Sequence, residues 1–131
     1  MVIKKDYMYA NWRRPKVLDG VTKSIKTPAG TLHLTFNYDG GLVEIIGHIG
    51  KEGSYLSKQI DIICRLISVT LQTPLSRVKL VKKLKKNLLD IPMDDMQFEF
   101  EGVKYASIED YIFKAVVKEL EEKELQEELK A

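Results

Sequence analysis

Side chains alternate from Val21 to Thr27 and from Thr31 to Tyr38, a period-two pattern typical of β-strands with one buried face. Two turn signals follow these runs: Pro28 with Gly30, and an Asp-Gly-Gly run at positions 39–41, after which Leu42 to Ile49 is expected to form a third strand. The sequence therefore predicts three strands, at residues 21–27, 31–38 and 42–49. Because short turns join them, the strands should form an antiparallel meander whose apolar face must be covered by helices.

Three helices are expected to supply that cover. Apolar residues recur at helical spacing from Leu56 to Leu71, which predicts a long amphipathic helix directly after the third strand. Thr73 and Pro74 are residue types favoured at a helix start, so a second helix is expected from Leu75 to about Asn87. Ser107 is placed to cap a third helix.

The predicted fold class is α+β: an antiparallel β-meander packed on helices, with an added C-terminal hairpin and helix. The hairpin is expected between residues 96 and 105. Beyond about Glu121 the last helix is so charged that we expect it to be exposed or to pack on another subunit. A length of 131 residues favours one domain. Within it we distinguish an N-terminal arm (1–20), a core (21–87) and a C-terminal extension (88–131).

Several functional classes are not expected from the composition. No apolar run approaches the roughly 20 residues that span a bilayer, and no signal-peptide pattern follows the first residues, so we expect a cytoplasmic protein. Cys64 is the only cysteine and His33 and His48 are the only histidines, so we expect no internal disulfide, no metal site and no cofactor. A net charge of +2 does not favour nucleic acid as a partner.

The candidate ligand site is the turn Gly50-Lys51-Glu52-Gly53-Ser54, between the third strand and the long helix. A glycine turn exposes backbone N–H groups, Ser54 can cap the helix, and both Lys51 and a helix N-terminus favour an anion. The predicted ligand therefore carries phosphate and binds Gly50, Lys51, Gly53 and Ser54. The alternative is a turn that only reverses the chain, and the sequence leaves both interpretations open.

Four further residues are candidates for the same ligand. His48 comes just before the turn, Arg65 lies on the polar side of the long helix, and Arg13 and Arg14 belong to the N-terminal arm. The two arginines of the arm could bind a phosphate or a partner's carboxylate. We favour the simpler interpretation, an extended arm whose Trp12 packs on the domain while its charges are solvated.

No catalytic residue is predicted. Neither histidine has the motif context of a Ser–His–acid triad. Cys64 lies among the apolar residues of the long helix, which favours a buried structural thiol over a nucleophile.

Three stretches, in this order and at this spacing, resemble one protein family. They are residues 18–30, residues 32–38, and Ile49-Gly50-Lys51-Glu52-Gly53-Ser54 with Arg65-Leu66-Ile67-Ser68 following. Together they are similar to the TSCPD domain, which is found near the C-terminus of adenosylcobalamin-dependent (class II) ribonucleotide reductases. The resemblance covers about residues 13–86. It implies the fold and a binding surface, but the family's cysteine motif and the reductase barrel with its radical cysteine are absent, so it does not imply the reaction.

Three functions follow as hypotheses. The first is a non-catalytic binding module, related to the reductase domain, that binds a nucleotide at the turn or contacts a reductase subunit. The second is a free-standing protein, of the kind that viruses use, that sequesters a nucleotide signalling molecule. The third is a structural protein that forms homo-oligomers through its C-terminal helix.

Overall fold

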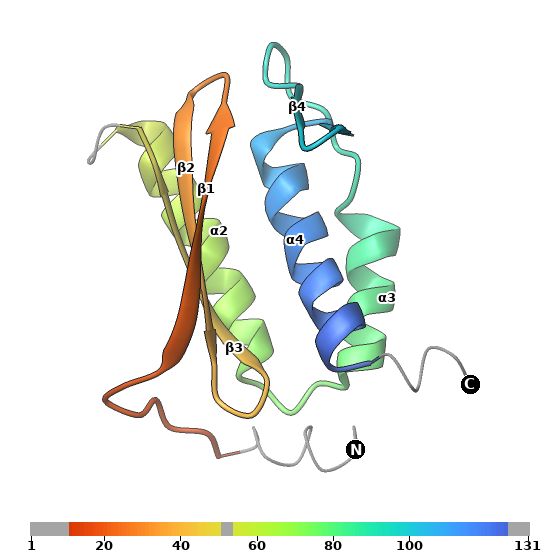
Figure 1. Ribbon diagram of the computed structural model, residues 1–131. Helices are drawn as coiled ribbons and strands as arrows, with labels where there is room; N and C mark the ends of the chain where they lie inside the picture. The colour runs from red at the N-terminus through yellow and green to blue at the C-terminus, as the bar shows by residue number, and fades with distance from the viewer. Residues whose placement is uncertain (1–10, 51–53, 126–131) are drawn as a thin grey trace.

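The computed structural model describes residues 11–50 and 54–125, and Figure 1 shows how their helices and strands are arranged. In chain order the elements are β1 (Asp19–Thr27), β2 (Gly30–Tyr38), β3 (Leu42–Ile49), α2 (Tyr55–Leu71), α3 (Arg77–Asn87), β4 (Phe98–Phe100), β5 (Val103–Tyr105) and α4 (Ile108–Lys123). The α+β class, the meander, the C-terminal hairpin and the last helix are all confirmed. None of the helices in these residues is long and apolar enough to cross a membrane.

The sheet has the order β1-β2-β3, and both strand pairs are antiparallel. Leu32, Leu34 and Phe36 of the central strand are completely buried, whereas His33 and Thr35 between them are only partly buried. The apolar face therefore belongs to the core, as the period-two pattern predicts. Helix α2 packs against β3, and α3 lies beside α4 (Figure 1).

A glycine permits the close approach of α2 to the sheet. A Cβ atom built on Gly47 of β3 would lie 2.8 Å from the Sγ atom of Cys64 in α2, which is tighter than real contacts allow. Cys64 is completely buried, and burial raises the pKa of its thiol to about 12. The expectation of a buried thiol is thus confirmed by the complete burial of Cys64.

The predicted start of the second helix is wrong by two residues. Helix α3 begins at Arg77 instead of Leu75, and its cap is Ser76, whose Oγ atom accepts a hydrogen bond from the N–H of Lys79. Thr73 instead donates its hydroxyl to the carbonyl of Thr70, at the end of α2. Two residue types favoured as N-caps stand close together in the sequence, and the second of them starts the helix.

The expectation that the chain beyond Glu121 is too charged for the core is wrong as far as Leu125, and residues 126–131 lie outside the described residues. Leu125 is completely buried, and the side chain of Glu124 is only 4 % exposed beside that of Arg77, which is 1 % exposed. The guanidinium of Arg77 donates to the carbonyls of Leu42 and Leu71, at 2.9 and 3.1 Å. One buried charged pair therefore joins β3, the end of α2, the start of α3 and the chain that follows α4.

The C-terminal hairpin is fixed to the start of α4 by a buried carboxylate. Ser107 caps α4 as predicted, and its Oγ atom accepts a hydrogen bond from the N–H of Asp110. The side chain of Asp110 accepts hydrogen bonds from the N–H groups of Asp90 and Ala106, and it lies 3.0 Å from the amine of Lys114. This carboxylate thereby holds the loop at residue 90 and the end of β5 against the helix.

Candidate functional site

The amino end of α2 has the capped geometry that the sequence predicts. Ser54 adopts an extended backbone (φ −69°, ψ 158°), and its Oγ atom accepts a hydrogen bond from the N–H of Ser57 at 3.1 Å. No acidic residue lies in the first turn of the helix, and Lys58 adds a positive charge there. Lys51 and Gly53, two of the predicted ligand residues, lie outside the described residues.

Gly50 has a left-handed backbone (φ +59°), which a residue with a side chain rarely adopts. The turn between β1 and β2 packs directly against it. A Cβ built on Gly30 would lie 3.6 Å from the Cα of Gly50, and a Cβ built on Gly50 would lie 3.4 Å from the carbonyl oxygen of Ala29. The hairpin tip therefore supports the site from one side.

His48 lies on the open face of the sheet, beside the other histidine. It pairs across the strands with His33, and the two ring centroids are 5.1 Å apart. The hydroxyl of Ser24 lies 3.0 Å from the Nδ1 atom of His33. The sequence did not predict this pairing, because it depends on the register of β2 and β3. Within the described residues no group of three or more His, Cys, Asp or Glu side chains could hold a metal ion.

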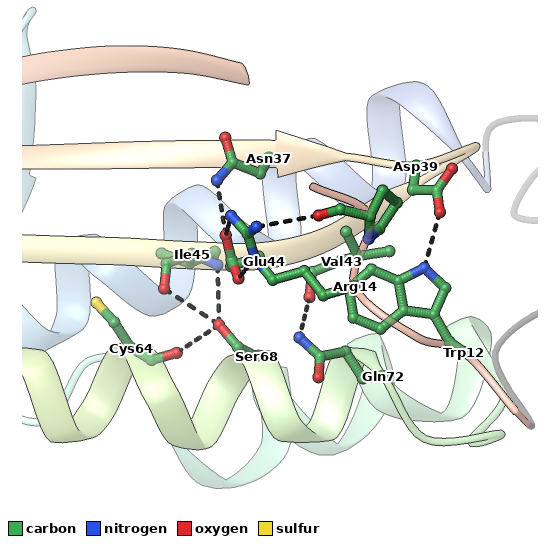
Figure 2. A network of polar contacts seen from close by, with 11 residues as sticks. Trp12, Arg14, Asn37, Asp39, Val43, Glu44, Ile45, Cys64, Ser68 and Gln72 are labelled. Carbon is green, nitrogen blue, oxygen red and sulfur yellow. Dashed lines mark hydrogen bonds and ion pairs between the residues drawn. The ribbon is translucent and has the colours of Figure 1, made fainter. Parts of the chain in front are cut away.

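Arg14 forms a two-pronged ion pair with a carboxylate of its own chain. Its Nε and Nη2 atoms donate to Glu44 at 2.9 and 3.1 Å, and Asn37 donates to the same carboxylate at 2.8 Å (Figure 2). The hydrogen bond from Arg14 is the main cause that lowers the pKa of Glu44. With the indole of Trp12 donating to Asp39 at 2.8 Å, this pair fastens the N-terminal arm along β3.

The outer edge of β3 is closed by two side chains of α2 (Figure 2). The hydroxyl of Ser68 bonds both the N–H and the carbonyl of Ile45, at 2.9 and 3.1 Å. The amide of Gln72 donates to the carbonyl of Val43 at 3.0 Å. These bonds occupy backbone groups that an edge strand otherwise offers to another chain.

Arg65 and Arg14 border one open groove of about 580 Å³, which also contains Glu44 and Asp61. Arg65 pairs with Asp61 at 3.0 Å, so both guanidinium groups in the groove already face a carboxylate. Arg65 is eleven residues beyond Ser54, or about 16 Å along the helix axis at 1.5 Å per residue. Of the predicted residues that the structure describes, Gly50 and Ser54 lie at the amino end of α2, and Arg14 and Arg65 border this groove. His48 lies on the open face of the sheet, and Arg13 is exposed on the arm.

A second concave surface, not predicted from the sequence, lies between β1 and the C-terminal extension. It has a volume of about 580 Å³ and joins lysines to aromatic rings: Lys23, Lys114 and Lys118 with Phe100, Tyr105 and Tyr111. The ring of Tyr111 meets those of Phe100 and Tyr105 edge-on, at centroid distances of 5.9 and 4.9 Å. The aromatic residues at positions 98–111 were the one sequence feature that could have indicated this surface. Lys23 could not be assigned to it, because only the tertiary fold brings Lys23 close to these residues.

These features define a small α+β domain with a capped helix start beside a glycine turn. The TSCPD domain model matches residues 5–120, which include the hairpin and most of α4. No curated protein and no solved structure matches the chain. The chain belongs to the TSCPD domain family, as its resemblance implied, and this membership relates it to a module of ribonucleotide reductases.

Proposed function

We propose that this chain is a non-catalytic, cytoplasmic binding module. In this proposal it takes a phosphate-bearing ligand, such as a nucleotide, at the turn from Gly50 to Ser54 and the amino end of α2. The relation to ribonucleotide reductases supports nucleotides as the ligand class and a reductase subunit as a partner.

The observation that carries the proposal is the charge around the three helix starts. Helix α4 begins with Glu109 and Asp110, whose carboxylates offset the partial positive charge of a helix N-terminus. Helix α3 begins with Arg77, which already faces Glu124. The first turns of α2 and α3 both lack an acid, but Arg77 of α3 is buried beside Glu124. Helix α2 contains Lys58 and directly follows the glycine turn with Lys51 in the sequence, so we place the anion at α2.

The backbone at this end supports the same ligand. The N–H groups of Ser57 and Lys58 are bound by Ser54, through its hydroxyl at 3.1 Å and its carbonyl at 3.1 Å. The two preceding amides, of Tyr55 and Leu56, are where we place the phosphate oxygens. Lys51, three residues before the cap in the sequence, would add a charge-assisted bond.

Calorimetric titration of the full chain with a panel of nucleoside mono-, di- and triphosphates tests the proposal. At least one of them should bind, and Lys51→Ala should weaken it by about 1 to 3 kcal/mol, or roughly 5- to 150-fold in Kd. The matched control is Lys82→Ala, which removes an exposed lysine on α3 and should leave the affinity unchanged.

Two results would contradict the proposal: no heat with any nucleotide, or the same affinity for Lys51→Ala and the parent protein. The reductase partner is tested separately, by capture of a purified class II reductase on the immobilised chain. A failure to retain the reductase would remove that partner and leave the ligand site standing.

A further inference from the structure

Helix α2 carries an apolar stripe on the side that faces away from its core. Four side chains form this outer stripe, with exposed fractions of 81, 56, 62 and 59 %: Tyr55, Ile62, Leu66 and Val69. At 100° per residue they fall within an arc of about 60°, opposite the buried residues of the same helix. Contiguous exposed apolar surface of this kind marks an interaction site.

The apolar surface extends beyond the helix on both sides. Leu66 also borders an apolar cavity of about 260 Å³, which Leu84 of α3 and Phe113 of α4 help to line. Val69 borders the groove beside β3 together with Ile46, which is 44 % exposed. A partner that covered the outer stripe would therefore also reach apolar surface from neighbouring elements.

The charges beside the stripe indicate which partner fits. Asp61 and Arg65 lie along one flank of the helix, where they pair with each other at 3.0 Å. In the sequence, Ile63 is midway between Asp61 and Arg65. The mean of the residue numbers of the four stripe residues is also 63. If two α2 helices meet antiparallel about a two-fold axis at Ile63, each Asp61 comes beside the Arg65 of the other copy. The surface is thus complementary to itself.

We propose that the outer stripe of α2 is a self-association surface, on which two copies of this chain pair with their α2 helices antiparallel about Ile63. Pairing through the β3 edge of the sheet is disfavoured, because Ser68 and Gln72 already bind the backbone of Ile45 and Val43 on the outer side of this strand. The surface shares Tyr55 with the proposed ligand site, but its other three residues lie at least seven positions further along α2, so it can be tested without a ligand.

Sedimentation equilibrium over a range of protein concentrations tests the surface. The parent protein should form a dimer, and Ile62→Glu should weaken the dimer at least tenfold, because it places a charge in the centre of the stripe. Val103→Glu is the matched control: Val103 is 49 % exposed on β5, far from the stripe in the chain, and its replacement should leave the dimer intact. Circular dichroism checks that both variants remain folded.

A charge exchange tests the antiparallel arrangement. Asp61→Arg and Arg65→Asp should each weaken self-association, since like charges then meet across the two-fold axis. An equimolar mixture of the two variants should associate better than either alone, because the mixed pair restores both Asp–Arg contacts.

Three results would overturn the proposal. The first is a parent protein that stays monomeric at 100 µM, whether or not it binds another protein through α2. The second is a dimer that Ile62→Glu does not weaken. The third is a mixture of the two charge variants that associates no better than each variant alone.

Discussion

Glu44 shows how one side chain fixes a segment that has no regular structure. Its carboxylate receives hydrogen bonds from Arg14 in the arm and from Asn37 in β2. The bond from Arg14 holds the pKa of Glu44 below its usual value, against the opposing effect of partial burial. A carboxyl whose pKa is lower in the folded state stabilises the fold above its unfolded pKa, and this contribution is lost as the pH falls through the folded pKa.

Arg14→Gln should therefore lower the stability at pH 7 and should make the remaining stability less sensitive to acid between about pH 5 and pH 3. Urea unfolding across this pH range measures the effect. Arg13→Gln is the matched control, since it removes the neighbouring exposed arginine and should leave the pH profile as in the parent protein. If both variants gave the same pH profile, the role of the Arg14–Glu44 pair would be disproved.

Single side chains in this structure also mark the limit of prediction from sequence. Arg14 was a candidate from the sequence, but its partner Glu44 could not be predicted, because the two residues are thirty positions apart and meet only once the arm lies on β3. The pairing of His33 with His48 is equally a product of strand register. Cys64 was predicted correctly because burial follows directly from the apolar residues around it.

At the scale of elements, the pair Arg77–Glu124 joins β3, the end of α2, the start of α3 and the chain after α4. Local sequence patterns do not indicate that these elements are in contact. Arg77 bonds the carbonyls of Leu42 and Leu71, and Glu124 accepts a hydrogen bond from the N–H of Leu42 at 3.0 Å. Removal of one member leaves the other as a buried charge without its counter-ion, which is strongly destabilising.

Arg77→Ala should accordingly lower the free energy of unfolding by about 3 to 5 kcal/mol, as measured by urea denaturation. Lys79→Ala, on the exposed side of the same helix, should change it by no more than about 0.5 kcal/mol. A loss below about 1 kcal/mol for Arg77→Ala would mean that the pair does not hold these elements together.

The elements themselves were largely predictable, for physical reasons that differ between them. The first two strands of the meander follow from their alternating side chains, and the third from an apolar segment after the strong Asp-Gly-Gly turn signal. Helix α2 follows from a long run of helical period. The start of α3 was less well determined, since Thr73 and Ser76 are both suitable caps. The burial of Arg77 could not be predicted from the sequence, because Arg77 begins a lysine-rich stretch, where a charged residue is normally exposed.

At the scale of the whole molecule, the candidate sites lie on separate surfaces with different lining residues. The turn residues from Gly50 to Ser54 are contiguous in the sequence, so a site made of them could be proposed before the fold was known. The cleft with Lys23 and Tyr111 and the groove of Arg14 and Arg65 are assembled by the fold, and sequence patterns do not report such distant neighbours.

The most direct test of the central claim is a nuclear magnetic resonance titration of the ¹⁵N-labelled chain with the nucleotide panel and with inorganic phosphate. If the ligand binds where we propose, the amide shifts concentrate at Gly50 and at residues 54–58, at the amino end of α2. Shifts confined to the cleft around Tyr105 and Lys118, or no shift with any of these ligands, would contradict that claim.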